Sequence, residues 1–143
     1  MRIGIIGTGR MAGVFAQTLA QMEEVQCYGV ASRSKEKAEK FAEEYGFEKA
    51  FGSYEELCED PEIELIYIAT PHSFHYENME LCIRHKRPVL CEKAFTLNSS
   101  QARKIIDLAK KEDVFMAEAI WTRYMPSRNM INELLDSGII GKV

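Results

Sequence analysis

The stretch that decides the fold is residues 2–12, Arg-Ile-Gly-Ile-Ile-Gly-Thr-Gly-Arg-Met-Ala. Its first five residues are mostly β-branched and predict a strand, and apolar spacings of three and four over residues 10–22 predict a helix. Between the two, Gly7, Gly9 and Ala12 fit the pattern G-x-G-x-x-A. A glycine-rich turn that joins a first strand to a first helix indicates a dinucleotide-binding loop.

Each small residue of this loop meets a physical requirement. Gly7 permits a tight turn, Gly9 lets the backbone approach a pyrophosphate, and Ala12 lets helix and strand pack closely. The N-terminus of the helix then offers free N–H groups and a positive dipole end to the phosphates. Arg10 either adds charge beside the pyrophosphate or stays solvated. The residues expected to bind the cofactor here are Gly7, Thr8, Gly9, Arg10 and Met11.

The rest of the chain continues to alternate short apolar runs with amphipathic stretches. This alternation predicts an α/β fold with a doubly wound parallel sheet, in which the apolar run 65–69 is a central strand. Further strands are expected at 25–31, 48–51, 88–91 and 114–118, and further helices at 34–45, from 53, at 74–86, 98–112 and 126–136. The first helix is indicated by apolar side chains at Met11, Val14, Phe15, Thr18, Leu19 and Met22, which are spaced three and four residues apart.

Size and composition describe an ordinary globular domain. The chain has 143 residues, 46% hydrophobic side chains and a net charge of −4, which argues against nucleic acid or an anionic membrane as a partner. No apolar run resembles a signal peptide or a membrane span. The four cysteines form no C-x-x-C pair, so we expect packed, reduced thiols and a cytoplasmic protein.

The end of the second strand predicts the cofactor preference. An NAD-binding domain usually has an acidic residue about 20 residues beyond the glycines, where it binds the ribose hydroxyls. This chain has Ala31-Ser32-Arg33-Ser34 at that place. Arg33 with Ser32 can bind a 2′-phosphate, which favours NADP and leaves NAD possible. Alternatively, Ser32 and Ser34 only begin the next helix and Arg33 is solvated.

Two more segments follow strands at the carboxyl edge of the sheet, where ligands of open α/β folds bind. One is Thr70-Pro71-His72 and the other is Glu92-Lys93. His72 and His75 lie three residues apart without a nearby cysteine or carboxylate ligand, so no metal site is expected.

These segments together resemble the N-terminal Rossmann domain of the glucose-fructose oxidoreductase, inositol dehydrogenase and MocA (Gfo/Idh/MocA) family. The resemblance rests on residues 7–12, Ala69-Thr70-Pro71 and Glu92-Lys93, and it spans nearly all of the chain. The closer likeness is to the NADP-dependent dihydrodiol and D-xylose dehydrogenase branch. It is carried by Val-Leu-Cys-Glu-Lys at 89–93 and Glu-Ala-Ile-Trp-Thr-Arg at 118–123.

The resemblance implies a role for each segment. In the family, the lysine matching Lys93 lies beside the nicotinamide ribose and hydrogen-bonds the reacting hydroxyl, and the glutamate matching Glu92 helps to hold the cofactor. Ala94 replaces the family's proline, which would loosen the backbone that orients Lys93. By the same resemblance, Thr70, Pro71 and His72 lie near the ribose and nicotinamide, and Trp121 and Arg123 form a wall of the substrate pocket. Packing of Trp121 against the last helix is the alternative.

The resemblance therefore implies an oxidoreductase domain that binds NADP(H) and transfers hydride to or from a secondary alcohol of a sugar or cyclic trans-diol. Residues 1–120 would form the cofactor domain, and residues 121–143 a linker helix and the start of a second α/β substrate domain. The whole protein would be a homo-oligomer, and the short chain would be inactive alone. The alternative is a non-catalytic NAD(P)-binding or regulatory module.

Overall fold

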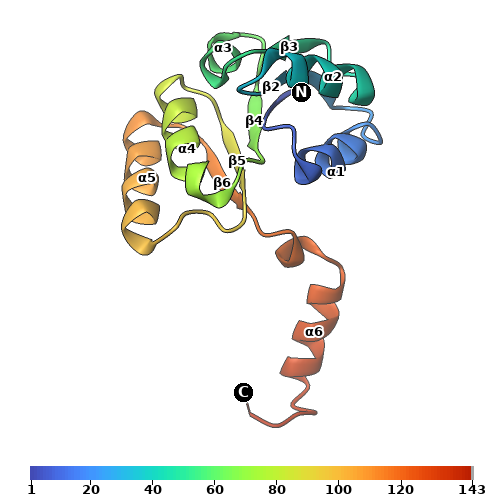
Figure 1. The fold of residues 1–143 in the computed structure, drawn as a ribbon. Helices are drawn as coiled ribbons and strands as arrows, with labels where there is room; N and C mark the ends of the chain where they lie inside the picture. The colour runs from blue at the N-terminus through green and yellow to red at the C-terminus, as the bar shows by residue number, and fades with distance from the viewer. Residues whose placement is uncertain (143) are drawn as a thin grey trace.

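Six strands form one parallel sheet in the order β3-β2-β1-β4-β5-β6 (Figure 1). The computed structural model describes residues 1–142. The strands are β1 (Arg2–Ile6), β2 (Gln26–Ala31), β3 (Lys49–Phe51), β4 (Leu65–Ile68), β5 (Val89–Glu92) and β6 (Met116–Ala119). The strand order reverses between β1 and β4, and in such sheets the ligand crevice lies at the carboxyl ends of these central strands.

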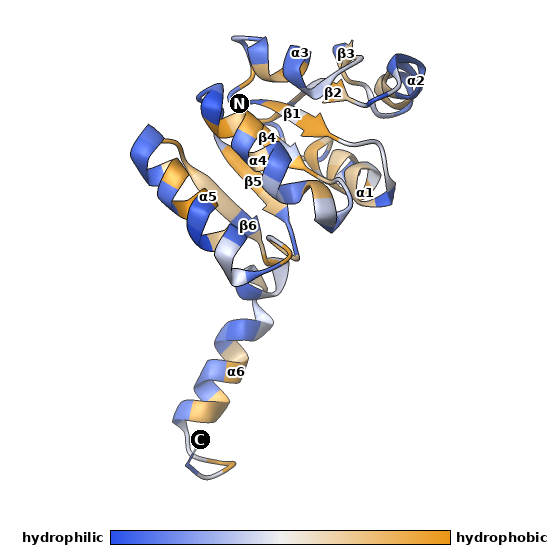
Figure 2. Ribbon diagram, turned by 60° about the vertical axis from the view of Figure 1, so that its left-hand side comes forward, coloured by the Kyte–Doolittle hydropathy of each residue, from blue (hydrophilic) through white to orange (hydrophobic). Residues whose placement is uncertain are grey.

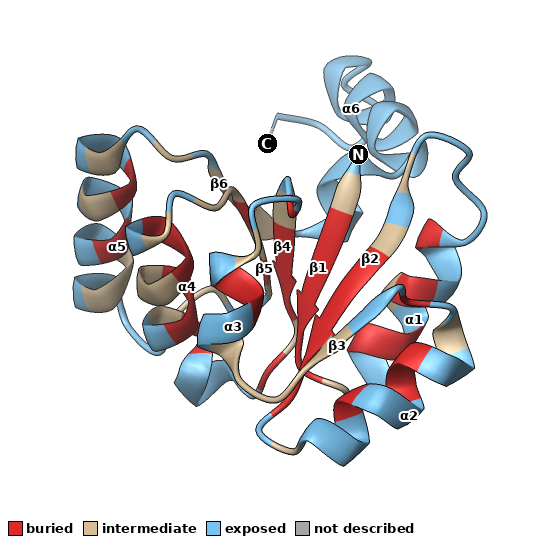
Figure 3. Ribbon diagram, turned by 90° about the horizontal axis from the view of Figure 1, so that it is seen from above, coloured by how far each residue is buried: buried red, intermediate tan, exposed pale blue. Residues whose placement is uncertain are grey.

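Helices cover both faces of the sheet, which confirms the doubly wound α/β prediction (Figures 1 and 3). One face carries α1 (Arg10–Leu19) and α2 (Lys35–Tyr45). The other carries α3 (Tyr54–Glu59), α4 (His75–Arg84) and α5 (Ser99–Glu112). The short 3₁₀ helices η1 (His72–Phe74) and η2 (Trp121–Tyr124) and the terminal helix α6 (Ser127–Asp136) complete the chain.

The sheet separates two hydrophobic cores. Ile5 of β1 and Tyr67 of β4 pack into the core below α1 and α2, whereas Ile6 and Ile68 pack into the core below α3, α4 and α5. This division follows from the two-residue period of a strand, which sends successive side chains to opposite faces. The central strands are therefore buried on both sides (Figure 3).

Side-chain caps begin three of the helices at the places that the sequence indicates. Ser34, Ser53 and Asn98 are the N-caps of α2, α3 and α5. Each side chain accepts a hydrogen bond from the N–H three residues later, at 3.4, 3.1 and 3.0 Å respectively. Such caps satisfy backbone donors that a helix start leaves without a partner.

Only part of the apolar pattern of the first helix faces the sheet. Met11, Val14 and Met22 are each about half exposed, at 45%, 46% and 49%. The buried side of α1 is formed by Ala12, Gly13, Ala16 and Leu19. Small residues occupy it because this helix lies close to the sheet directly behind the glycine loop.

Several predicted boundaries also shift. The helix expected over 10–22 ends at Leu19, and the strand expected over 114–118 is Met116–Ala119. The helix expected over 74–86 consists of η1 followed by α4. The chain tightens into a 3₁₀ turn before α4, as helix starts often do.

The C-terminal segment extends away from the sheet (Figures 1 and 2). Residues 120–142 are all exposed, and α6 has an amphipathic pattern with exposed Ile131 and Leu134. In residues 1–142, none of the helices has the length and apolar character that crossing a bilayer requires.

Candidate functional site

The turn after β1 requires glycine at position 7. Gly7 has a φ of +107°, and its N–H donates to the carbonyl oxygen of Ala31 at 2.9 Å. A Cβ at this position would lie 3.0 Å from the carbonyl oxygen of Ala69. The chain is thus confined between β2 and β4, where only glycine fits without strain.

Gly9 has a different environment. It is the N-cap of α1, and a Cβ added to it would meet nothing within 4 Å among the described residues. Within residues 1–142, the first turn of α1 has neither a side-chain cap nor an acidic residue. Its N–H groups therefore face open space, as a helix start that binds an anion requires.

Gly13 is a structural requirement of the loop that the sequence reasoning missed. A Cβ at Gly13 would lie 2.8 Å from the hydroxyl oxygen of Tyr45 on α2. Gly13 thus lets α1 and α2 pack together beside the glycine loop. The only local signal was a second small residue directly after Ala12.

The segment after β2 was expected either to bind a phosphate or only to begin the next helix, and it has features of both. Ser34 caps α2, and the hydroxyl of Ser32, which is 9% exposed, accepts from the N–H of Ser34 at 3.4 Å. Arg33, however, is not simply solvated: its guanidinium lies over the ring of Phe74 at 5.5 Å. Both line a cavity of about 620 Å³, together with Ser53, Tyr54, Glu77 and Asn78.

The loop after β4 is fixed by buried hydrogen bonds. The Nδ2 of Asn78 donates to the hydroxyl of Thr70 at 2.9 Å, and both residues are nearly buried. The ring of His75 is fully buried and contacts the carbonyl oxygen of Thr70 at 2.9 Å. Pro71 and His72 remain exposed on the outer side of this loop.

Glu92 is held in place by two donors. The hydroxyl of Tyr67 donates to its Oε1 at 2.5 Å, and the backbone N–H of Lys93 donates to its Oε2 at 3.2 Å. The Tyr67 ring stacks on Phe15 of α1, with ring centroids 3.8 Å apart. Burial raises the pKa of Tyr67, and the hydrogen bond to Glu92 raises it further, so the phenol stays protonated.

Lys93 directly follows β5 and is exposed. Within residues 1–142, no hydrogen bond or salt bridge engages its Nζ, which is therefore available to a ligand. The peptide bond between Lys93 and Ala94 is cis. His75 of α4 and Glu118 of β6 contact the next peptide group, between Ala94 and Phe95. These contacts support the loop although Ala94 stands in place of the family's proline.

Three of the predicted segments meet at one small cavity of about 80 Å³. It lies beside the glycine loop, between the loops that follow β4 and β5. Parallel strands bring their carboxyl ends to one edge of the sheet, so segments far apart in sequence converge there. The lining residues are Met11, Ala69, Thr70, His72, Glu92 and Lys93.

The family model described as an oxidoreductase family with an NAD-binding Rossmann fold matches residues 1–119. The chain belongs to this Gfo/Idh/MocA family. It is 39% identical over 143 residues to trans-1,2-dihydrobenzene-1,2-diol dehydrogenase of Mus musculus, covering 99% of this chain and 43% of that protein. It is 41% identical over 155 residues to D-xylose 1-dehydrogenase (NADP(+)) of Hypocrea jecorina, covering 100% of this chain and 40% of that protein.

Among solved structures, the Gfo/Idh/MocA chain resembles a 3-ketoreductase from Actinomadura kijaniata in complex with TDP-benzene and NADP. The TM-score is 0.93 at 26% identity, over 100% of this chain and 44% of that one. A probable dehydrogenase from Thermotoga maritima superposes with a TM-score of 0.89 at 29% identity, over 99% and 43% of the two chains. The chain thus spans less than half the length of these relatives.

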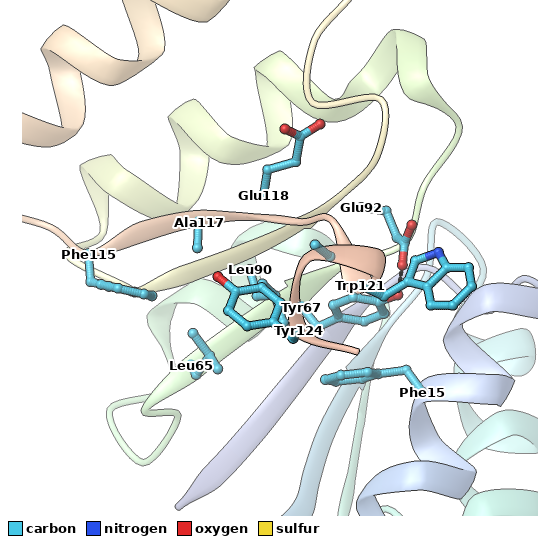
Figure 4. Close-up of a pocket in the computed structure, with 11 residues that line it drawn as sticks. Phe15, Leu65, Tyr67, Leu90, Glu92, Phe115, Ala117, Glu118, Trp121 and Tyr124 are labelled. Carbon is cyan, nitrogen blue, oxygen red and sulfur yellow. Dashed lines mark hydrogen bonds between the residues drawn. The ribbon is translucent and has the colours of Figure 1, made fainter. Parts of the chain in front are cut away.

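A second, apolar cavity of about 540 Å³ adjoins the first in this Gfo/Idh/MocA domain (Figure 4). It lies on the α1 side of β4, β5 and β6, and Glu92 lines both cavities. Trp121 lines it and is 63% exposed, so this side chain is not packed in the core of the domain. Arg123 is exposed and lines neither cavity. Other lining residues are Phe15, Leu65, Tyr67, Leu90, Phe115, Ala117, Glu118, Ala119 and Tyr124.

Cys91 lies next to Glu92 but has the environment of a packed thiol. Burial raises the pKa of Cys91 to about 12, and the carboxylates of Glu92 and Glu118 add to the shift. All four cysteines are free. In residues 1–142, no group of three or more histidine, cysteine or acidic side chains is arranged to bind a metal.

We expect native Cys91 to resist alkylation at about pH 8, reacting roughly a thousandfold more slowly than an unperturbed thiol. A raised pKa leaves less thiolate at a given pH, by about tenfold per unit. The measurement is iodoacetamide labelling followed by peptide mass spectrometry. Half-buried Cys27 should react first, and the urea-unfolded chain, in which every thiol is accessible, is the control. Rapid labelling of native Cys91 would contradict this view.

Proposed function

We propose that the chain is the cofactor-binding half of an oxidoreductase that transfers hydride between NADP(H) and a secondary alcohol of a sugar or cyclic trans-diol. The observation that carries the proposal is the cavity where Met11, Thr70, His72, Glu92 and Lys93 meet. Lys93, whose ammonium group has no partner among residues 1–142, lines this cavity together with Met11 of the glycine loop. A fold that only needed to be stable would not need these groups together.

The glycine loop and the start of α1 would hold the pyrophosphate, because their N–H groups face open space beside Gly9. Thr70, Pro71, His72 and Glu92 would surround the ribose and nicotinamide. The nicotinamide, when bound, supplies the hydride acceptor or donor. The ammonium of Lys93 would donate a hydrogen bond to the reacting oxygen of the substrate and stabilise the negative charge that develops there.

Arg33 supports NADP as the preferred cofactor. Its guanidinium stands over Phe74 at the edge of the 620 Å³ cavity, where it can bind a 2′-phosphate. The D-xylose relative is named for NADP(+), and the 3-ketoreductase was solved with NADP. The Ser32 hydroxyl, which accepts from Ser34, would also lie beside this phosphate.

Arg33→Ala should weaken NADPH binding roughly 10- to 150-fold and leave NADH binding nearly unchanged, because a charge-assisted hydrogen bond is worth roughly 1.5–3 kcal/mol. Both cofactors are titrated at fixed salt by nicotinamide fluorescence, with calorimetry as a check. Arg103→Ala, which removes an exposed arginine on α5, is the control for lost charge. Equal losses for both cofactors would refute the selector role of Arg33. Cofactor binding without hydride transfer by the full-length protein, over a broad panel of sugars and diols, would favour a regulatory module.

The substrate side of the site would come from residues beyond the cofactor domain. The relatives, which are named as diol and sugar dehydrogenases, are more than twice as long as this chain. We propose residues 1–120 as the cofactor domain and 121–143 as the linker into a second domain, with Trp121 and Arg123 in the wall of the substrate pocket. The exposed apolar side chains of the 540 Å³ cavity and of α6 support this division. The free thiols support a cytoplasmic location, and a homo-oligomer is proposed for the whole protein.

A further inference from the structure

One peptide group next to Lys93 is held at both ends by side chains from other elements. The carbonyl oxygen of Ala94 lies 2.8 Å from Nδ1 of His75, at the start of α4. The N–H of Phe95, which belongs to the same peptide group, donates to Oε1 of Glu118 on β6 at 3.0 Å. The peptide group is therefore clamped between a histidine and a carboxylate.

The ring of His75 is held at both of its nitrogens. The second, Nε2, lies 2.9 Å from the carbonyl oxygen of Thr70, and the residue is 0% exposed. The ring is therefore fixed between the loop that follows β4 and the Ala94–Phe95 peptide group.

Glu118 holds the opposite end of the same peptide group. Its carboxylate accepts from the N–H of Phe95, so the two side chains engage both polar atoms of this peptide group. Asn78 donates to the Thr70 hydroxyl, which leaves the Thr70 carbonyl to His75. The ring of His72 meets the His75 ring edge-on, with centroids 5.4 Å apart.

The clamp bears on Lys93 because little else orients that residue. Among residues 1–142, only backbone contacts fix its position, since its Nζ has no partner. We propose that His75 and Glu118 are positioning residues that clamp the Ala94–Phe95 peptide group and thereby orient Lys93 toward the cofactor cavity. That Lys93 is oriented toward a cofactor rests on the proposed function, whereas the clamp itself can be tested without any cofactor.

The test removes the contact that Glu118 makes with the clamped peptide group. Glu118 is half-buried on the edge strand, so Glu118→Ala should fold. We expect the amide signals of Lys93 and Phe95 to shift and to split into more than one set. Glu118→Gln keeps an acceptor oxygen and should restore a single set of amide signals. The control Glu43→Ala, on α2, should leave the amide signals of both Lys93 and Phe95 unchanged. Unchanged Lys93 signals in Glu118→Ala would overturn the clamp, and failure of NADPH to bind the wild-type chain would count against the proposed function alone.

Discussion

Replacing Lys93 by methionine is expected to reduce hydride transfer by about 10²- to 10³-fold, the usual effect of removing one donor that stabilises charge in a transition state. Methionine keeps the length and apolar character of the side chain but cannot donate a hydrogen bond. NADPH affinity should stay within about threefold, since the proposed contact of Lys93 is to the substrate oxygen. The measurements are kcat for the oxidoreductase and a direct titration with NADPH.

The surroundings of Lys93 make this variant a clean test. Its Nζ has no partner in residues 1–142, so its loss should leave the melting temperature unchanged. Lys40→Met is a matched control, because Lys40 is an exposed lysine on α2 that pairs only with Glu36. Turnover that survives in Lys93→Met would exclude the proposed role. A loss of NADPH binding equal to the loss of turnover would instead make Lys93 a cofactor-binding residue.

Much of the fold could be predicted because local patterns carry its signals. The glycine loop, the capping residues Ser53 and Asn98, and the apolar run of β4 each lie within a few residues of sequence. Parallel topology then brings Thr70 and Glu92 to one edge of the sheet. The general location of the site therefore followed from the order of the strands.

What the sequence did not reveal depends on contacts between distant segments. The pairing of Tyr67 with Glu92 comes from the register of β4 and β5, in which Tyr67 lies opposite Leu90 and diagonal to Glu92. The contact from His75 to Ala94 spans 19 residues. Apolar spacing alone also does not show that the buried side of α1 consists of Ala12, Gly13, Ala16 and Leu19, because it is the close approach of helix and sheet that selects the small residues.

The glycine loop offers a test that separates binding from folding within three residues. Gly9→Ala should fold normally, since the added Cβ meets nothing within 4 Å and the backbone is extended. The same methyl group would occupy the space proposed for the pyrophosphate. We expect NADPH affinity to fall by about 10- to 100-fold, because overpacking costs roughly 1–3 kcal/mol. Calorimetric titration gives the affinity, and thermal unfolding gives the stability.

Gly7→Ala is the matched variant with the opposite expectation. Its φ of +107° and the Ala69 carbonyl oxygen, 3.0 Å from the new Cβ, oppose the native backbone. We expect a loss of roughly 1–3 kcal/mol of stability and a lower melting temperature, with or without cofactor. The two glycines thus have different reasons to be glycine, one for the turn and one for the ligand. If Gly9→Ala bound NADPH as tightly as the wild type, the cofactor would not lie on this loop, even though the fold is that of a dinucleotide-binding domain.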